Sequence, residues 1–457
     1  MSSHSLETLK FHYSRAKQSM LASDFETAKT AFLCLLEIQP DYGLFHYNLA
    51  SCYVELKQWD LAFRHYGLAL KLEADLASDP DIYFNLGVCA ERLGLLAEAQ
   101  DFYQKAVSYK PDFVEGLFNL GLVAAKRGVN QLAIESFEVA KAKLVKRFSE
   151  RQALDSSSPF LSDSLCSSTS LSAGEIKSGS PLGGESAKYQ LLTEINFHLA
   201  RLNSDPIPKP PVSHVKSLFD QYADHYDEHM VNKLSYILPE IMADWIFKFS
   251  LNQTKTFESA AAIWESPRLK ILDLGCGTGL MAQALINKSL QKLEIHGVDL
   301  SPNMLELARE KGVYQSVSCE DILDYLNTAC ESKQWDGVMA ADVLNYFGDL
   351  FDLFQKVKKA LKPGGWFCFS VEVADFEFVS SLVGDTDSAP KEGIREGKLV
   401  EGETGWILQS TGRYTHNQTY VKNSIENAQL HLISQETFQA RTQAGEKVLQ
   451  RVFWINY

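Results

Sequence analysis

The stretch from Ile271 to Gly279, ILDLGCGTG, constrains the fold of this chain most strongly. An apolar run ends at Asp273, and glycines follow at alternate positions, Gly275, Gly277 and Gly279, before a helical pattern begins. Glycine lets a backbone turn sharply and approach a ligand with no Cβ in the way. The stretch therefore predicts a strand, a tight loop and a helix, which together begin a βαβ unit.

A second apolar run ends at Asp299, 26 residues after Asp273, within the segment HGVDLSPNML. A carboxylate at that strand tip can accept hydrogen bonds from both ribose hydroxyls of a nucleoside. A dinucleotide loop requires G-x-G-x-x-G, but its third glycine position is Leu280 here, and no P-loop lysine follows the glycines. An NAD-dependent oxidoreductase and a nucleoside triphosphate site therefore fit the loop poorly.

At these positions the sequence resembles the class I S-adenosylmethionine-dependent methyltransferases, whose first motif is similar to this glycine loop. The resemblance implies S-adenosylmethionine as cofactor, with Asp273 and the glycine backbone at its methionine end and Asp299 at its ribose. It also implies that Asp321 accepts a hydrogen bond from the adenine amino group and that Ile322 lies against the ring. The alternative for Asp321 is a solvated helix-capping aspartate.

The segment Ser217 to Met230, SLFDQYADHYDEHM, carries three aromatic rings on one helical face, among them Tyr222 and Tyr226. Core packing would explain that stripe. The form F-D-x-Y-A-x-x-Y-D also looks like a segment of small-molecule methyltransferases, including ubiquinone- and biotin-pathway enzymes, where it covers the cofactor. That resemblance implies cofactor contact by Tyr222 or Tyr226. His225 and His229 have zinc-ligand spacing, but no third ligand is evident, so no metal site is predicted.

Strand and helix patterns alternate after the glycine loop, and they place two further carboxylates at one edge of a sheet. Predicted strands cover residues 293–298, 314–318, 335–340, 366–372, 430–440 and 448–457. Asp342 follows one strand and Glu372 ends another, at the carboxyl edge where open α/β sheets bind ligands. The alternative for Glu372 is an ordinary surface glutamate. The pattern and the KPGG turn predict a Rossmann-like fold with a seven-stranded, mostly parallel sheet and an antiparallel edge strand.

The GRYTH cluster holds the candidate acceptor-side residues Arg413, Tyr414 and His416. We expect Arg413 and Tyr414 to line the acceptor pocket, and the alternative is a purely structural turn. If the acceptor must lose a proton, His416, Asp342 or Glu372 can serve as the catalytic base. A carboxylate acceptor, already anionic, would need Arg413 instead.

An internal repeat precedes this region. Ala28, Ala62, Ala99 and Ala133 are separated by 34, 37 and 34 residues, and an aromatic ring follows each of them four positions later. The pattern resembles the tetratricopeptide repeat and predicts an all-α solenoid of four helix pairs over residues 6–145.

The groove of such a solenoid is the candidate partner site. Asn48, Asn85, Asn119 and Arg92 are candidates to hold a peptide backbone or carboxylate of an unidentified protein partner, and the alternative is that the repeats dock within the chain.

Between the two regions, residues 146–212 form a predicted serine-rich linker that contains a helix over 187–202, and residues 213–457 form the predicted methyltransferase domain. The chain as a whole resembles a bacterial group of predicted methyltransferases that carry tetratricopeptide repeats. The function implied is methyl transfer to a small-molecule or protein acceptor, with the repeats recruiting a partner or substrate. The alternative is a catalytically silent interaction scaffold.

The amino-acid composition limits which classes of binding partner we expect. The formal net charge of −14 disfavours unassisted binding to nucleic acid or an anionic membrane. The eight cysteines form no C-x-x-C pair, which predicts reduced thiols in the cytosol, and the N-terminus shows no signal-peptide pattern.

Overall fold

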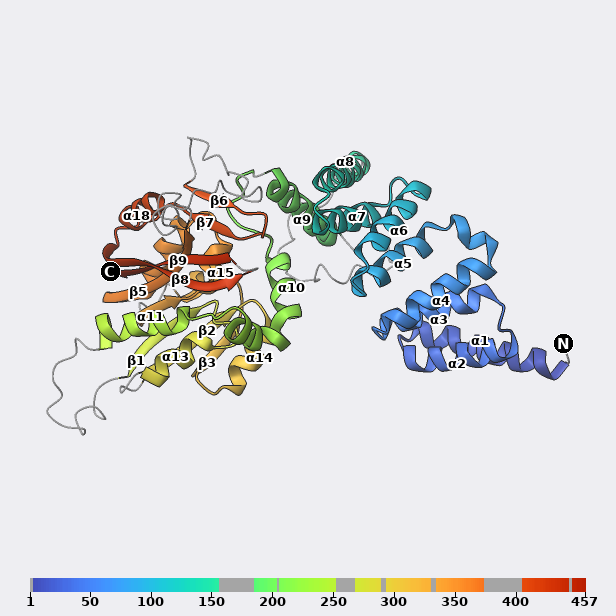
Figure 1. Ribbon diagram of the computed structural model, residues 1–457, viewed down its shortest axis with the longest axis horizontal. Helices are drawn as coiled ribbons and strands as arrows, with labels where there is room; N and C mark the ends of the chain where they lie inside the picture. Colours follow the sequence, from blue (N-terminus) through green and yellow to red (C-terminus); the bar gives the residue numbers. More distant parts are fainter. Residues whose placement is uncertain are drawn as a thin grey trace, which may run out of the picture. The chain divides into compact units, whose positions relative to one another are not determined.

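A computed structural model of the chain describes residues 3–155, 185–203, 205–251, 268–288, 293–329, 334–373, 405–443 and 446–457. Within these ranges the chain forms two compact units, the first extending to Leu199 and the second beginning at Ala200. The ribbon in Figure 1 colours the helical first unit in blue to green and the mixed second unit in green to red.

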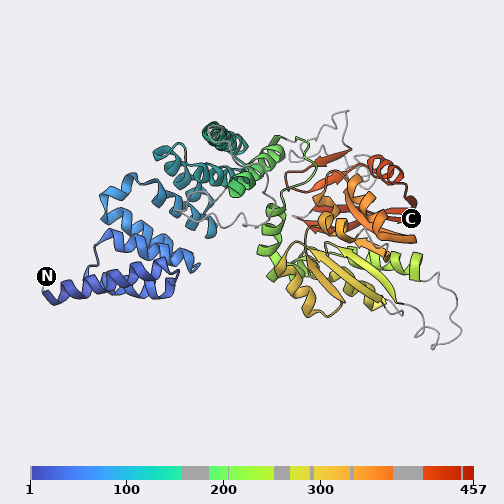
Figure 2. The ribbon, with the colours of Figure 1, turned by 180° about the vertical axis from the view of Figure 1, so that it is seen from behind.

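The first unit is built from helices in antiparallel pairs (Figures 1 and 2). Its helices are α1 (Ser3–Leu21), α2 (Phe25–Ile38), α3 (Gly43–Glu55), α4 (Trp59–Leu72), α5 (Pro80–Arg92), α6 (Leu96–Tyr109), α7 (Val114–Lys126), α8 (Asn130–Asp155) and α9 (Glu185–Asn203), with the 3₁₀ turn η1 (Ala74–Ser78) after α4. The pairs α1–α2, α3–α4, α5–α6 and α7–α8 are the predicted helical repeats.

The four repeated alanines and the rings that follow them are packing positions. Ala28, Ala62, Ala99 and Ala133 are fully buried, and so are the rings Phe32, Tyr66, Tyr103 and Phe137. In the pairs α5–α6 and α7–α8, a glycine on the first helix faces the ring on the second. A Cβ built on Gly87 would stand 2.6 Å from the ring of Tyr103, so only glycine permits this approach of α5 to α6.

The segment 146–212, predicted as a linker, contains described helix that packs on the repeats. The ring of His198 on α9 stacks on Phe137 of α8 with centroids 5.3 Å apart, and Tyr189 stacks on Phe148 at 4.5 Å. Helix α9 therefore extends the helical stack of the first unit. The serine-rich residues 156–184 lie outside the described residues.

The second unit is organised around one mixed sheet. Its strands are β1 (Leu269–Leu274), β2 (Leu293–Asp299), β3 (Ser316–Cys319), β4 (Trp335–Ala340), β5 (Leu361–Val373), β6 (Trp406–Leu408), β7 (Tyr414–His416), β8 (His431–Gln443) and β9 (Glu446–Asn456). The order is β3-β2-β1-β4-β5-β7-β6, with β9 paired to β5 and β8 to β9. Pairing is parallel from β3 through β5 to β7, whereas β5–β9, β8–β9 and β6–β7 are antiparallel.

The prediction of a Rossmann-like, mostly parallel sheet with an antiparallel edge is confirmed, and the expected number of seven strands is approximate, because the described residues form nine. The two extra strands, β6 and β7, have three residues each. The GRYTH cluster, for which a turn was the alternative, thus contributes β7. The predicted KPGG turn lies inside β5, where the pairing with β4 shifts register and Gly364 has φ +79°.

Helices cover both faces of the sheet. They are α10 (Val212–Tyr222), α11 (Leu238–Ile246), α13 (Leu280–Lys288), α14 (Pro302–Glu310), α15 (Ile322–Ala329), α16 (Phe351–Ala360) and α18 (Gln418–Asn427), with short turns η2 (Ala223–His225), η3 (Glu228–Lys233), η4 (Phe247–Leu251) and η5 (Leu344–Tyr346). Ser301 and Asn417 cap α14 and α18 through their side chains, as their positions before helical patterns indicate.

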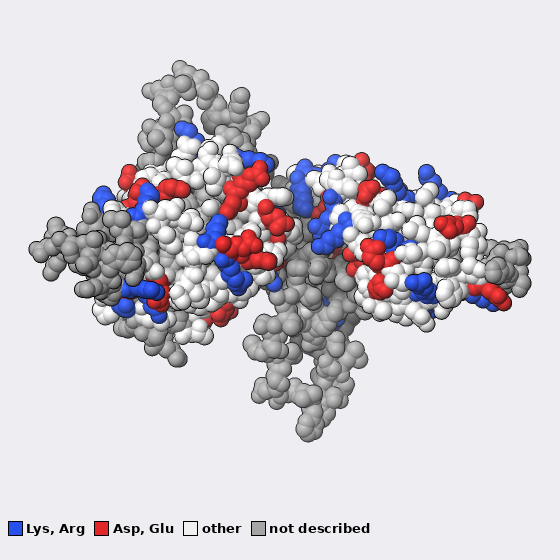
Figure 3. All heavy atoms as spheres, turned by 90° about the horizontal axis from the view of Figure 1, so that it is seen from below, with Lys and Arg blue, Asp and Glu red and all other residues white. Residues whose placement is uncertain are grey.

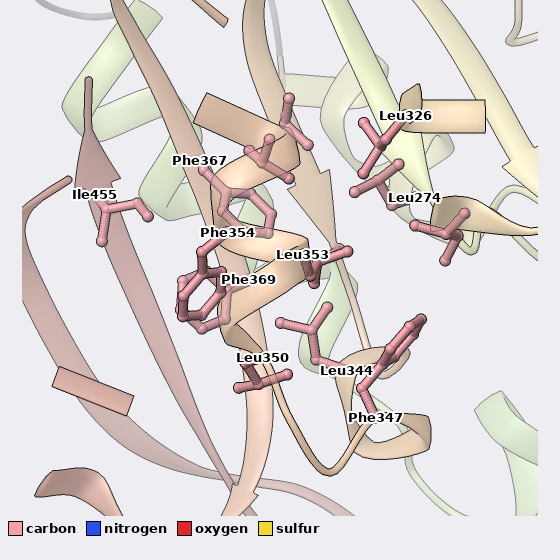
Figure 4. Packing of buried hydrophobic residues seen from close by; sticks show 14 of the residues in the cluster. Leu274, Leu326, Leu344, Phe347, Leu350, Leu353, Phe354, Phe367, Phe369 and Ile455 are labelled. Carbon is pink, nitrogen blue, oxygen red and sulfur yellow. The ribbon is translucent and has the colours of Figure 1, made fainter. Parts of the chain in front are cut away.

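Alternate residues of each central strand enter different cores. Phe367 and Phe369 of β5 pack with Phe354 of α16 on one face, which Figure 4 shows from close by. Trp366 and Cys368, their neighbours along β5, pack on the other face under α11 and α13. Because both faces are buried, the strands are almost continuously apolar, and their polar residues gather at the strand ends.

Candidate functional site

A pocket opens at the carboxyl ends of β1, β2 and β4, where this class of sheet binds ligands. It holds about 720 Å³ of space, part of which is open to solvent. Its lining comes from the segment before α10, from α10 itself, from the residue after η2, and from the segments that follow β1, β2, β3 and β4: Lys209, Pro210, Val212, Val215, Phe219, Tyr226, Gly275, Gly277, Asp299, Leu300, Met304, Asp321, Ile322, Ala341, Asp342, Val343, Tyr346 and Phe347.

The glycine loop forms one wall through its backbone. Gly275, Gly277 and Gly279 have φ of +67°, +52° and +91°, which L side chains rarely adopt. A Cβ on Gly275 would stand 2.3 Å from the side chain of Val343, whereas one on Gly277 would meet no described atom within 4 Å. Gly277 thus presents bare backbone to the pocket.

Asp299 joins the glycine loop to the second strand. Its Oδ2 accepts the N–H of Gly277 at 2.8 Å, and its Oδ1 accepts the N–H of Ser301 at 2.9 Å. Burial raises the pKa of Asp299 above its usual value, and the backbone donors act against that rise. Each oxygen keeps a further lone pair, so the carboxylate can still accept from a ligand.

Asp273 lies beneath the loop and does not line the pocket. It is 1% exposed, and its Oδ2 accepts the hydroxyl of Tyr314 at 2.8 Å. Burial raises the pKa of Asp273 to about 7, with that hydrogen bond opposing the change. The structure therefore places this predicted methionine-end residue under the backbone that forms the wall.

Asp321 and Ile322 also line the pocket, and they lie at the start of α15. Asp321 Oδ1 accepts the N–H of Leu323 at 2.9 Å, which is a capping contact, and its Oδ2 pairs with Lys209 Nζ at 2.6 Å. The Asp321 side chain thus both caps α15 and lines the pocket.

The F-D-x-Y-A-x-x-Y-D segment forms α10 and η2 and covers the pocket. Tyr226 lines the pocket, but Tyr222 does not; its ring packs edge-on against Tyr226 at 5.4 Å and against His229 at 5.3 Å. Neither His225 nor His229 belongs to a cluster of three candidate metal ligands among the described residues.

Two carboxylates of the same segment fasten it to the sheet. Asp220 accepts the Ser301 hydroxyl at 2.6 Å, beside the ribose candidate Asp299. Asp227 accepts the hydroxyl of Thr278 in the glycine loop and pairs with Lys311 Nζ at 2.5 Å. The aspartates of the motif therefore fasten this segment to the sheet, and two of its rings, Phe219 and Tyr226, line the pocket.

Asp342 sits at the end of β4 in the left-handed region, with φ +57°. Its carboxylate pairs with Arg413 at 2.5 Å and with Arg441 at 3.0 Å, and it also accepts the side-chain amides of Asn345 and Gln450. Burial raises its pKa, but the two guanidinium groups outweigh burial, so the pKa of Asp342 lies below the usual value. Asp342 is therefore ionised at neutral pH.

Glu372 and Arg413 complete this ion network. Glu372 Oε1 accepts from Arg413 at 2.7 Å and from Arg441 at 2.7 Å, so two arginines balance two carboxylates. Arg413 also donates to the hydroxyl of Tyr346 at 3.1 Å. Glu372 and Arg413 do not line the pocket, but Arg413 holds Asp342 and Tyr346, which do, and Glu372 holds Arg413.

The remaining GRYTH residues lie behind the pocket wall. His416 is 1% exposed, its Nε2 lies 3.1 Å from the carbonyl of Gly348, and burial lowers its pKa to about 4. Tyr414 is fully buried and donates its hydroxyl to the carbonyl of Ile207 at 2.7 Å. Neither lines the pocket.

In the repeats, the predicted groove residues already make contacts within the first unit. The side chain of Asn48 donates to the carbonyl of Leu44 on its own helix, and Asn85 is buried. The guanidinium of Arg92 lies 5.5 Å from the ring centre of Trp59.

Two family models match the chain in the places that this geometry indicates. Residues 272–367 match a methyltransferase domain, and residues 42–112 match a tetratricopeptide repeat. The chain joins tetratricopeptide repeats to a methyltransferase domain.

Two curated O-methyltransferases are similar to part of this chain. A malonyl-[acyl-carrier protein] O-methyltransferase of Priestia megaterium is 32% identical over 26% of this chain and 48% of its own length. A ubiquinone biosynthesis O-methyltransferase of Actinobacillus pleuropneumoniae serotype 5b is 31% identical over 22% of this chain and 44% of its own length. The match thus spans about half the length of these relatives.

Among solved structures, magnesium protoporphyrin IX methyltransferase from Synechocystis PCC 6803 is 12% identical. It covers 53% of this chain and 97% of its own, with a TM-score of 0.35. No described helix is both long and apolar enough to span a bilayer.

Three residues at the site were not predicted from the sequence, because no local pattern indicates them. Lys209 stands in a proline-rich segment, while Arg441 and Gln450 stand in strand patterns near the C-terminus. Each reaches the site only because the fold brings a distant segment to it.

Proposed function

We propose that the chain is an S-adenosylmethionine-dependent methyltransferase. The observation that carries the proposal is that one pocket gathers Gly277 backbone, Asp299 and Asp321, each from a different strand end. A carboxylate for ribose, a carboxylate for an adenine amino group and an open glycine wall together suit a nucleoside with a bulky 5′ substituent.

In this proposal different residues of the pocket contact different parts of the cofactor. Asp299 accepts from the ribose hydroxyls, Asp321 accepts from the adenine amino group, and Ile322 lies against the ring. The backbone of Gly275 and Gly277 and the ring of Tyr226 lie at the methionine end, and Asp273 supports the loop from below. The cofactor supplies an electrophilic methyl group on a sulfonium.

The acceptor end is assigned to Asp342, Tyr226 and Tyr346. The protein has to align the acceptor with the methyl group and exclude water, and buried rings with one ionised carboxylate suit that task. Asp342 is the candidate base, while Arg413 and Glu372 are positioning residues that hold it. His416 supports the wall through Gly348.

The tetratricopeptide repeats are proposed to recruit a protein partner or a protein substrate, with Asn48, Asn85, Asn119 and Arg92 near the binding groove. On the face in Figure 3, acidic and basic side chains are interspersed, which suits a protein partner better than a polyanion. Each of the six cysteines in the described residues is unpaired, and we propose a cytosolic location. The acceptor is a small molecule or a protein.

Calorimetric titration of the full chain with S-adenosylhomocysteine tests the proposal. We expect one saturable site per chain, and binding should weaken roughly tenfold or more in Asp299→Ala, because two hydrogen bonds to a charged acceptor are lost. Asp324→Ala, at an exposed position on α15, is the matched control and should bind like the parent. No binding by the parent would favour the scaffold alternative.

Transfer of a labelled methyl group into a size-fractionated lysate then separates the two acceptor classes. Label in the protein fraction indicates a protein acceptor, and label in the small-molecule fraction a metabolite.

A further inference from the structure

The segment 205–211, DPIPKPP, forms a strap between α9 and α10. Four of its seven residues are prolines, which lack an N–H and fix φ, so the strap is stiff and its polar contacts come from carbonyls and side chains. Its residues Lys209 and Pro210 line the pocket. The strap is therefore part of the pocket wall.

One side of the strap is fastened by its carbonyls. The carbonyl of Ile207 accepts the hydroxyl of the buried Tyr414 at 2.7 Å. The carbonyl of Pro208 accepts the N–H groups of Gly348 at 2.8 Å and Asp349 at 3.3 Å. These anchors belong to β7 and to the turn after η5.

The other side is fastened by one charge pair. Lys209 Nζ lies 2.6 Å from Asp321 Oδ2, and its ammonium stands 5.2 Å from the ring centre of Phe347. The Lys209 side chain is 28% exposed and that of Asp321 10%, so the pair is partly shielded from solvent and its attraction is stronger than at an open surface. The strap thus spans the pocket from β7 to the start of α15.

We infer that Lys209 is a positioning residue that closes this strap over the adenine end of the pocket and so prolongs the lifetime of the bound cofactor. The inference rests on the proposed function. With Leu323 N–H on one oxygen and Lys209 on the other, the Asp321 carboxylate has a fixed plane before a ligand arrives. The pocket is present while the Lys209–Asp321 ion pair is formed, so the strap forms part of the pocket wall and leaves space for a ligand.

The experiment measures the dissociation rate of S-adenosylhomocysteine from the full-length chain by stopped-flow competition. Lys209→Met keeps an unbranched side chain that is one atom shorter and removes its charge, and we expect roughly fivefold faster dissociation. Lys209→Arg retains the charge and should restore a rate close to that of the parent. Raising the salt concentration should speed dissociation from the parent and have little effect on Lys209→Met.

The matched control is Lys362→Met. Lys362 forms an ion pair with Asp336 at the same 2.6 Å but does not line the pocket, so this variant should release the ligand at the parental rate. Equal rates in Lys209→Met and Lys362→Met would overturn the inference while leaving the proposed function intact. If the parent binds no S-adenosylhomocysteine, the proposed function fails, and this inference falls with it.

Discussion

Carboxylates of one sheet edge differ in what surrounds them, and this sets their roles. Asp299 receives two backbone N–H groups, Asp342 receives two guanidinium groups, and Asp273 receives a single phenol. The pKa of Asp342 is held down by its cationic partners, whereas burial raises the pKa of Asp273 to about 7. Residue type alone does not distinguish these environments.

The glycine wall yields a paired prediction. Gly277 and Gly312 both have positive φ, +52° and +65°, and a Cβ on either would meet no described atom within 4 Å. Substitution by valine should therefore cost both variants a similar strain, roughly 1–3 kcal/mol. Only Gly277 lines the pocket, so Gly277→Val should lose S-adenosylhomocysteine binding by titration, while Gly312→Val should keep it. Equal affinity in the two variants would contradict the placement of the cofactor.

Asp273 predicts a pH dependence of the second unit. Its pKa rises from 3.8 to about 7 on folding, so its stabilising contribution is complete below its unfolded pKa and is lost as pH rises through 7. Between pH 6 and 8 the ionisation of Asp273 should by itself remove about 1 kcal/mol of stability, a melting shift of roughly 2–4 °C. The pKa of His416 falls from 6.5 to about 4 on folding, so its effect has the opposite sign, extends up to about pH 6.5 and offsets part of the Asp273 effect just above pH 6.

The control for this pH effect is Asp273→Asn, which cannot ionise and can still accept the Tyr314 hydroxyl. Between pH 6 and 8 the melting temperature of the parent should fall relative to that of the variant. Parallel curves for parent and variant would show that Asp273 does not titrate in this range.

Sequence reasoning at the residue scale named the groups that follow strands and missed those that reach the site from elsewhere. Asp299 and Asp342 stand directly after apolar runs, which makes their common edge predictable, whereas Asp321 follows the polar segment SVSCE and was assigned through the family resemblance. Lys209 and Arg441 enter from a proline segment and a late antiparallel strand. Their partners are set by tertiary packing, which no local period in the sequence encodes.

Helices and strands could be predicted where apolar residues recur at regular intervals along the sequence. The helices of the repeats and the long strands have repeated apolar positions and were placed well, but β6 and β7 have three residues each. Alternation cannot be recognised over three residues, and these strands form only because β7 pairs with the end of β5. The KPGG bulge in β5 was mistaken for a turn because its glycines and proline are the usual turn residues.

Close helix packing in the repeats predicts opposite effects of two glycine substitutions. A Cβ on Gly121 of α7 would stand 2.6 Å from the ring of Phe137 on α8, whereas one on Gly67 of α4 would meet no described atom within 4 Å. Gly121→Ala should therefore destabilise the first unit by roughly 1–3 kcal/mol through overpacking. Gly67→Ala should stabilise it by roughly 0.5–1 kcal/mol, since alanine is the better helix former.

Thermal unfolding followed by circular dichroism at a helical wavelength measures both changes. If Gly121→Ala were as stable as Gly67→Ala, the distance between α7 and α8 would have to be larger than described.

For the whole molecule, the important fact is that the two units have separate hydrophobic cores. One apolar cluster is formed entirely by residues of α1–α8 and their turns, and two others by residues of the sheet and its covering helices. A ligand bound to the second unit stabilises that unit by mass action, and it has no such effect on a unit that unfolds independently.

We therefore expect two thermal transitions, of which S-adenosylhomocysteine raises only one. At a hundredfold excess over Kd the gain is about 2.7 kcal/mol, or roughly 5–10 °C for a unit of this size. Six of the seven tryptophans follow residue 200, and the other is Trp59, so intrinsic fluorescence reports mainly the second unit. The fluorescence transition should shift with ligand while the other transition, followed by helical circular dichroism, stays in place. A single transition that shifts as a whole would mean that the repeats and the methyltransferase domain unfold as one cooperative body.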